Sequence, residues 1–487
     1  MNRLSGNSYK DKKGALYFFK GRAVIVCALL SVLFFSTDTL AAETVDLSKA
    51  INYALTTNKE LRRSALRIKS GSLGIRGAEA DFKFRVRPEA SADYSNGKAS
   101  LGYGLGVSKK LDFGTDLSAT TAVSRDTDAD LHRSSIRLQV SQPIFRNFGP
   151  LVHREQIVQA TNKLKTVRRR YELQKTDLIV EVVQTYEGIL ELKRLVGSDK
   201  ESYKRMDGLY RVTKTKELLG RTTHIDTLRV ELLRGQAKSR LEGNRERLAS
   251  LRSDFAILLG FNPGKEFVLK PTPELEFSMP QPGEAVKIAL ENRLDYAQVI
   301  QDHADALRQV KIAKRRLLPD LNLFAGHEWT GEDTDAGRAL RLDESIWFVG
   351  VNVNSELNRA REKAALGEAR INKESAFGTI EIIELSIARQ VQQHLLKYRR
   401  ASTEVKIAER NFELARGRAK LARRLFELGR GDNFTVTDAE EAYLRAENQL
   451  FSARSEVSIS NYRLFRTLGT LVEIPEELRP KRVKRQI

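Results

Sequence analysis

Two long helical segments constrain the fold of this chain more than any other feature of its sequence. The stretch from Leu151 to Leu219 contains no proline and only three glycines, and the stretch from Glu356 to Leu428 is similar. A continuous helix of either length would reach on the order of 100 Å, whereas helices of globular proteins average about 11–12 residues. Helices this long need lateral partners, so we expect a coiled coil or a helical bundle.

Each long segment ends at the same short signature. Gly220 in LLGRTTHIDTLRVELL and Gly429 in ELGRGDNFTVTDAEEA both follow a leucine and interrupt a helical pattern. A second helical arm then runs to another Leu-Gly pair, at Gly260 in the first case and at Gly469 in the second. The sequence therefore predicts that Gly220 and Gly429 each end one long helix and start its antiparallel mate.

The segments before these hairpins are duplicated as well. Helical patterns that start near Val45, with a turn at Asn58, and near Gly283 each lead to a proline, Pro88 or Pro319. After each proline the apolar period changes from 3.6 to 2, as in SLGYGLGVS, SIRLQVSQP and WFVGVNVN. An apolar face opposite a small or polar face suits a transmembrane β-barrel, and it suits the edge of an ordinary β-sandwich equally well.

The first strand region is the longer one and contains an additional predicted hairpin in KKLDFGTDLS, with Gly114 at its turn. The sequence leaves open whether this hairpin joins a barrel or lies at its rim. A few strands from one chain leave open edges, so a barrel built from them requires several copies of the chain.

We divide the chain into two structural repeats with flanking segments. The predicted segments are a signal peptide at residues 1–42, a first repeat at 43–262, a linker at 263–281, a second repeat at 282–470 and a basic C-terminal tail at 471–487. The first repeat comprises helices at 43–86, a strand region at 87–145 and a helical hairpin at 146–262. The second comprises helices at 282–318, a strand region at 319–355 and a helical hairpin at 356–470. Prolines cluster in the linker. The end of the tail, ELRPKRVKRQI at residues 477–487, has no apolar period, so we expect it to be disordered.

The N-terminus has the pattern of an export signal. A basic segment precedes the apolar run from Ala23 to Phe35, and small residues follow it up to Ala42. An uncleaved anchor helix is the alternative. The only cysteine, Cys27, lies within this segment, so we expect an exported chain without disulfides.

Charge and motifs argue against an enzyme and against a nucleic-acid-binding protein. The net charge is +20, but the Lys and Arg residues are spread among Glu along helices, as in solvated helix faces. The six histidines show no metal-ligand spacing, and GYGLGV at Gly102 and the tripeptide DFG at Asp112 lack the companions of phosphate-binding motifs. We predict no catalytic residue, no cofactor and no metal.

The order of these motifs resembles the TolC-like outer-membrane efflux protein family. The resemblance rests on the opening helix with Asn58, on SQPIF where the first strand region ends, on LPDL where the second begins, and on the paired turns. It implies an α+β membrane protein, in which a trimeric outer-membrane β-barrel shared between protomers continues into a long periplasmic α-helical coiled-coil barrel.

The resemblance also implies a function. Such a homotrimer is a passive channel of a tripartite efflux or type I secretion system, in contact with outer-membrane lipid, a periplasmic adaptor (membrane fusion protein) and an inner-membrane transporter. The alternative is a periplasmic coiled-coil adaptor or scaffold protein without its own channel, which would not need the strand regions.

Residues at the two turns match those that narrow the periplasmic aperture in this family. Asp226 and Asp438 match aspartates, Thr435 stands where another aspartate is expected, and Phe426 occupies a position usually held by tyrosine. Gly431 stands where the resemblance leads us to expect an arginine. The aspartates could instead accompany helix N-termini, although Asp226 lies six residues past Gly220, which we take to be beyond the first turn. The resemblance assigns adaptor docking to the turns themselves, at Leu219, Gly220, Arg221, Leu428, Gly429 and Arg430.

Overall fold

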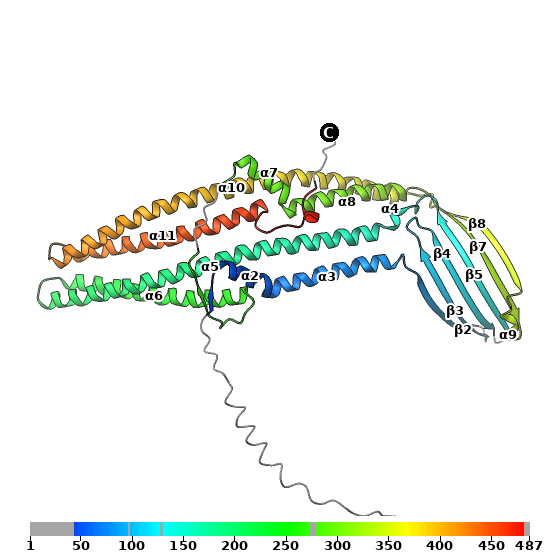
Figure 1. Ribbon diagram of the computed structural model, residues 1–487, viewed down its shortest axis with the longest axis horizontal. Coiled ribbons are helices and arrows are strands. Elements are labelled where there is room, and N and C mark those ends of the chain that lie inside the picture. The colour runs from blue at the N-terminus through cyan, green and yellow to red at the C-terminus, as the bar shows by residue number, and fades with distance from the viewer. Residues whose placement is uncertain (1–42, 96–97, 127–129, 273–278, 482–487) are drawn as a thin grey trace, which may run out of the picture.

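The computed structural model describes residues 43–95, 98–126, 130–272 and 279–481. The predicted signal peptide at residues 1–42 lies outside these ranges. The described chain is elongated, with a β-sheet at one end and two long helical hairpins that reach away from it (Figure 1).

Both repeats begin with a broken helical lead-in. The lead-in elements are β1 (Glu43–Val45), α2 (Leu47–Thr57) and α3 (Lys59–Ala80) in the first repeat, and α7 (Pro282–Asn292) and α8 (Leu294–Arg316) in the second. The predicted turn at Asn58 is confirmed, because this residue ends α2 and its side chain accepts a hydrogen bond from the N–H of Leu61 (3.0 Å) at the start of α3.

The two strand regions form one antiparallel sheet. Its strands are β2 (Arg85–Ser95), β3 (Lys98–Lys110), β4 (Asp116–Asp126), β5 (Leu131–Pro143), β7 (Asp320–Asp333) and β8 (Glu344–Asn354). They pair in the order β2-β3-β4-β5-β7-β8, so both repeats contribute to the sheet. The predicted hairpin at Gly114 is formed by β3 and β4 and is part of this sheet, while the short helix α9 (Ala336–Ala339) connects β7 with β8.

Each strand region is followed by a helical hairpin. After the short helix α4 (Pro150–His153), the first hairpin consists of α5 (Glu155–Leu218) and α6 (His224–Leu258), and the second of α10 (Ala360–Glu427) and α11 (Asn433–Leu468). The predicted chain reversals at Gly220 and Gly429 are therefore confirmed. None of the helices in the described ranges combines the length with the apolar character that crossing a membrane takes.

The first turn shows why a glycine stands at this position. Gly220 has a φ of 65°, a left-handed conformation that costs any residue with a Cβ atom additional energy. The N–H of Arg221 reaches back to the carbonyl of Lys216 (2.8 Å), which closes the end of α5. The side chain of Thr223 then caps α6, so one helix ends and the next begins within a few residues.

The second turn repeats this geometry. Gly429 has a φ of 72°, and the N–H of Arg430 donates to the carbonyl of Leu425 (2.8 Å) at the end of α10. The side chain of Asp432 accepts from the N–H of Thr435 (2.9 Å) and caps α11. The repeated Leu-Gly signature is thus a repeated helix stop, with a polar cap three residues after each glycine.

The predicted linker contributes a strand. Within residues 263–281, β6 (Phe267–Leu269) pairs in parallel with β1, so this segment does more than join the repeats. The buried Tyr186 of α5 places its hydroxyl between the carbonyls of Val45 (3.1 Å) and Lys270 (2.6 Å) and fixes the small sheet to the helices. Residues 273–278 lie outside the described ranges.

The expectation that residues 477–487 are disordered is wrong for their first part, residues 477–481, which pack on the helices together with the segment before them. Ile474 and Leu478 are buried against Leu294 of α8, and residues Glu476–Leu478 form a short 3₁₀ helix. Arg169 of α5 donates to the carbonyl of Leu478 (3.3 Å). The apolar side chains of Ile474 and Leu478 thus pack this part of the tail against the helices. Residues 482–487 lie outside the described ranges.

We predict different costs for alanine at two glycines that end helices in the same way. Gly220→Ala should lower the free energy of unfolding by about 1–2 kcal/mol, because only the left-handed conformation is strained there and a Cβ atom would meet nothing. Gly260→Ala should cost more, since its Cβ atom would also collide with the carbonyl of Thr57. Thermal unfolding of the detergent-solubilised variants measures both, and equal losses would contradict this account.

Candidate functional site

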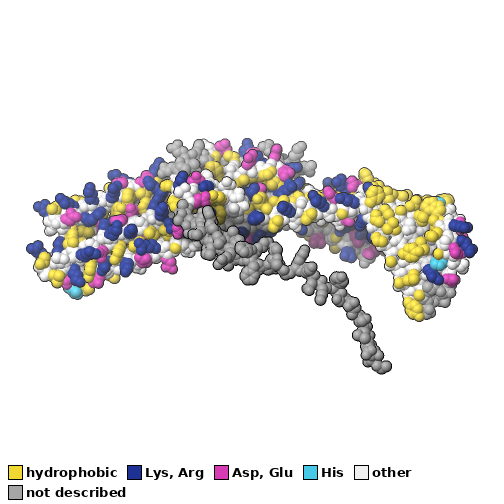
Figure 2. Space-filling model, turned by 60° about the horizontal axis from the view of Figure 1, so that its bottom comes forward, with side chains coloured by type: hydrophobic (Ala, Val, Ile, Leu, Met, Phe, Trp, Pro, Cys, Tyr) yellow, Lys and Arg dark blue, Asp and Glu magenta, His cyan; other side chains and the backbone are white. Residues whose placement is uncertain are grey.

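One face of the sheet is apolar and exposed. The strand registers place alternate residues of all six strands on this face. Its large exposed members are Val86, Tyr94, Leu101, Tyr103, Leu105, Leu117, Leu138, Val140, Leu323, Trp347, Val349, Val351 and Val353. In the space-filling view, hydrophobic side chains gather on the sheet end while charged side chains cover the helical part (Figure 2). A surface of this kind is suited to lipid and not to water.

The opposite face of the sheet is polar or small. Ion pairs lie on this face between β5 and β7, from Arg137 to Glu328 (2.8 Å) and from Arg133 to Glu332 (3.0 Å). The remaining positions are mostly Gly, Ser, Thr, Asn and Gln. A sheet with one apolar and one polar face matches the wall of a water-filled β-barrel.

Three large apolar side chains, Phe324, Ile346 and Phe348, are exceptions on the polar face. Phe324 lies opposite Gly350, and Phe348 lies opposite Gly326 on the neighbouring strand. A Cβ atom on either glycine would collide with the facing ring, so each ring lies flat over a glycine. This packing fixes the register of β7 and β8 and leaves both rings half-buried.

The strand lengths fit a membrane. Strands β2, β4 and β8 each have 11 residues, and the others are slightly longer. At about 3.4 Å per residue and a tilt of 35–45°, a strand of this length spans about 28 Å, close to the ~25 Å apolar band of outer-membrane barrels.

The hairpin turns lie at the far end of the molecule from the sheet (Figure 1). All six residues that the resemblance assigns to adaptor docking are exposed, with exposed fractions of 64% for Leu219 and 57% for Leu428. The Gly-Arg pair of each turn is held by backbone hydrogen bonds, so these side chains stand on a defined backbone. Two exposed leucines flanked by arginines form a surface that could contact a protein.

Asp226 has a structural role in the first turn. Its carboxylate accepts from the hydroxyl (2.6 Å) and the N–H (3.3 Å) of Thr223, while Thr223 caps the N–H of Asp226 in return. The Thr223 hydroxyl, with the nearby Arg229, holds the pKa of this carboxylate below its usual value. Because α6 begins at His224, Asp226 lies in the first turn, and the expectation that it lies beyond that turn is wrong.

The other three aperture candidates lie on the second hairpin. Asp438 of α11 forms an ion pair with Arg418 of α10, and Thr435 lies in the capped first turn of α11. Phe426, in the last turn of α10, is half-buried, and the ammonium group of Lys216 on α5 lies 3.9 Å from its ring centroid. Asp226 and Asp438 thus each have partners on their own hairpin, whereas Phe426 contacts the first hairpin.

One buried carboxylate near the turns was missed. Glu440 of α11 is only 2% exposed and accepts from Nε of Arg205 on α5 (2.8 Å), and Nε of Arg423 on α10 lies 2.9 Å from its other oxygen. It shares the buried face of α11 with Val436 and Ala439. The sequence carries a signal for this residue, because Glu440 occupies a position of the apolar stripe in VTDAEEAY.

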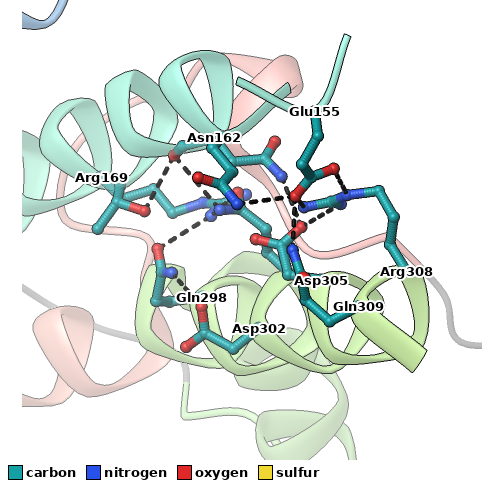
Figure 3. Close-up of polar contacts among 11 residues, drawn as sticks. Glu155, Asn162, Arg169, Gln298, Asp302, Asp305, Arg308 and Gln309 are labelled. Carbon is teal, nitrogen blue, oxygen red and sulfur yellow. Dashed lines mark hydrogen bonds and ion pairs between the residues drawn. The ribbon is translucent and has the colours of Figure 1, made fainter. Parts of the chain in front are cut away.

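A polar seam connects the two repeats near the sheet (Figure 3). It consists of Glu155, Asn162 and Arg169 on α5 and of Gln298, Gln301, Asp305, Arg308 and Gln309 on α8. Arg308 donates to Glu155 (2.7 Å) and to Asp305 (2.5 Å), and Asn162 donates to Asp305 (2.6 Å). Arg169 donates to Gln298 (3.1 Å) and to Gln301 (2.7 Å). Its α5 members recur every seven residues, which is the spacing of a coiled-coil contact.

Across the four described ranges, no group of three His, Cys, Asp or Glu side chains is arranged to hold a metal ion. The polar groups of the seam and around Glu440 are used for contacts between helices.

Comparisons with known proteins match one part of the chain to a family and the whole chain to a fold. Residues 285–470 match the family described as outer membrane efflux protein. A search of curated proteins found no match. Among solved structures, the outer-membrane channel OprN is similar with a TM-score of 0.69 and 17% identity, over 87% of this chain and 90% of that chain.

Two further solved structures agree with this result. The Campylobacter jejuni CmeC outer membrane channel gives a TM-score of 0.69 at 15% identity, over 88% of this chain and 86% of that chain. The outer membrane protein VceC from Vibrio cholerae gives 0.67 at 15% identity, over 87% of this chain and 96% of that chain. The resemblance inferred from the sequence is therefore confirmed: residues 285–470 match the outer membrane efflux protein family, and the chain as a whole has the fold of solved outer-membrane channels.

Proposed function

We propose that three copies of this chain form a passive channel that exports substrates across the periplasm and the outer membrane. The sheets of the three copies make one β-barrel in the membrane, and the helical hairpins make a tunnel that continues into the periplasm. An inner-membrane transporter supplies the energy, and a periplasmic adaptor connects it to the tunnel.

The two-faced sheet with open edges carries this proposal. Its apolar face is suited to lipid and its opposite face to water, as the wall of a pore requires. Strands β2 and β8 each have an unpaired edge, and a membrane tolerates no open sheet edge. A single copy cannot close on itself, so the sheet requires further copies. A coiled-coil adaptor would need none of these features.

The helical hairpins fit the periplasmic part of such a channel. They leave the sheet on one side only, and both turns lie at their far end (Figure 1). In a trimer the turns of the three copies form a ring, which exposes Leu219, Arg221, Leu428 and Arg430 to an adaptor. This placement supports adaptor docking at the turns.

We also propose that Asp226 and Asp438 give this end of the tunnel a preference for cations. Three copies would bring together carboxylates that are partly exposed beside their present partners. The capping role of Asp226 does not conflict with this, because a carboxylate in a first helical turn stays ionised and can act on passing ions. The pKa of Asp226 is lowered, which keeps its charge in place at neutral pH.

Membrane fractionation tests the proposed function. We expect the mature protein to stay in the outer-membrane fraction after a high-salt and an alkaline wash, because its apolar sheet face is in lipid. In mild detergent it should migrate as a trimer by light scattering. Release by either wash would favour the adaptor alternative, and a clean monomer would contradict a barrel shared between copies.

Charge removal tests the tunnel end. The paired variant Asp226→Asn with Asp438→Asn keeps oxygens that can accept the present hydrogen bonds but removes both charges. In planar bilayers with a salt gradient, its reversal potential should move toward zero, which means a loss of cation selectivity. Glu409→Gln is a matched control, because Glu409 is about as exposed as Asp438 and also pairs with an arginine, further along the hairpin. Unchanged selectivity in the paired variant would show that these charges do not face the ions.

A further inference from the structure

We propose that the β3–β4 hairpin is part of the membrane wall, so that three copies close a barrel of 18 strands through pairing of β2 in one copy with β8 in the next. This inference rests on the proposed function and specifies its pore. Three copies of the six-stranded sheet give the strand number. If the hairpin lay outside the wall, each copy would contribute only four strands.

The hairpin is fully integrated into the sheet. Each residue of β4 has a partner on β3 and another on β5, from Asp116 to Asp126. Strand β3 has the alternation of a barrel wall, because Tyr103 and Leu105 lie on the apolar face while Gly104 and Gly106 lie on the polar face. With an exposed fraction of 65%, Tyr103 would face water if the hairpin stood at the rim.

The turn of this hairpin is anchored to the strand–helix junction. The N–H of Gly149 donates to the carbonyl of Phe113 (3.0 Å), and the hydroxyl of Thr115 donates to Gln142 (2.5 Å). Gly114 has a φ of 94°, and a Cβ atom there would collide with His153 of α4. The hairpin is therefore held at the end of the sheet where the helices begin, in line with its neighbours.

The two open edges are complementary. Strands β2 and β8 have the same length of 11 residues. Antiparallel pairing throughout the sheet makes β8 of one copy run antiparallel to β2 of the next. When β2 of one copy pairs with β8 of the next so that the apolar faces of their sheets align, Val86, Ala90 and Ala92 lie on the same side as Val349, Val351 and Val353. Pro88 has no N–H and removes one donor from this edge, which an edge strand tolerates.

The strand number sets the width of the pore. With strands about 4.8 Å apart and tilted by about 40°, 18 strands enclose a circle about 36 Å across, against about 24 Å for 12 strands. Side chains occupy about 5 Å on the inner side of each wall, which leaves about 26 Å. Since a helix with its side chains is about 10–12 Å wide, two helices could pass together. The outer-membrane part then admits polypeptide cargo as well as small molecules.

Cysteine cross-linking tests the closure between copies. We would replace the only cysteine, Cys27, by serine, and combine Ala90→Cys on β2 with Trp347→Cys, Val349→Cys or Val351→Cys on β8 in the same chain. Within one copy these strands are five strand spacings apart, about 24 Å, whereas a disulfide needs Cα atoms within about 7 Å. A bond can therefore form only between copies. We expect at least one pair to give a covalent trimer on denaturing gels.

Two control sets make this result decisive. Ala90→Cys with Asn352→Cys places the thiols on opposite faces of the sheet and should give no bond. Ala90→Cys with Ser134→Cys, Ile136→Cys or Leu138→Cys on β5 should also give none, because β3 and β4 separate β2 from β5. A bond within one chain between β2 and β5 would place the hairpin outside the wall and overturn the inference.

The outcomes separate this inference from the proposed function. A bond within one chain between β2 and β5, in a protein that is a trimer in mild detergent, would overturn the 18-stranded closure and leave the shared channel standing. Release of the protein by alkaline wash would instead overturn the proposed function. A covalent trimer from a β2–β8 pair, with no bond in either control set, would support both the 18-stranded closure and the proposed function.

Discussion

The structure depends on a sheet that is apolar on one face and unpaired at both edges. In water, the exposed valines, leucines and aromatic residues of this face would be unfavourable, and the free backbone groups of β2 and β8 would pair with other chains. In the proposed trimer, lipid on one side and neighbouring copies at the edges would remove both problems. An even number of strands per copy also returns the chain to the side where it entered, so that all long helices leave the sheet in one direction.

In the helical part, polar contacts fix the register between helices where apolar packing alone would allow more than one. Apolar side chains such as Leu178, Val182 and Tyr186 pack α5 against the lead-in helices. Near the sheet, however, α5 and α8 meet through the polar seam, in which Arg169 and Glu155 are buried or nearly so. Long helices with similar faces could slide past one another by a heptad. Hydrogen bonds with fixed partners disfavour such a shift, because each shifted register leaves buried donors unpaired.

The parts that the sequence predicted are those with a local cause. The four Leu-Gly helix ends, at Gly220, Gly260, Gly429 and Gly469, all adopt a left-handed conformation, and a glycine in a helical pattern is a direct signal for it. The strands were predictable because strict alternation of apolar with small or polar residues is typical of a strand whose two faces meet different surroundings. The hairpin at Gly114 was visible for the same reason.

The parts that the sequence did not predict depend on distant partners. A strand as short as β6 has no period, and it forms because β1 and Tyr186 provide its partners. The C-terminal segment packs because Leu294 of α8 offers it an apolar contact far away in the sequence. The position of Asp226 in its helix was misjudged because the residues between Gly220 and the cap Thr223 belong to neither helix. The contact between the ammonium group of Lys216 and the ring of Phe426 could not be predicted, because the two residues lie on different hairpins.

These distant contacts also bear on how the tunnel end could open. Gly431 and Thr435 stand where the resemblance led us to expect charged side chains. A Cβ atom at Gly431 would lie 3.1 Å from the N atom of Phe426, so a larger residue would press on the end of α10. Contacts between the hairpins here include Lys216 with Phe426, Arg229 with Phe434, Thr213 with Asn433 and Arg205 with Glu440, and all of them join helices of one copy. Because Glu440 is buried, separating the two hairpins of a copy would remove one of its two arginine partners and leave only Arg423. An opening motion in which both hairpins of a copy move together keeps this ion pair intact and is therefore favoured over one that parts them.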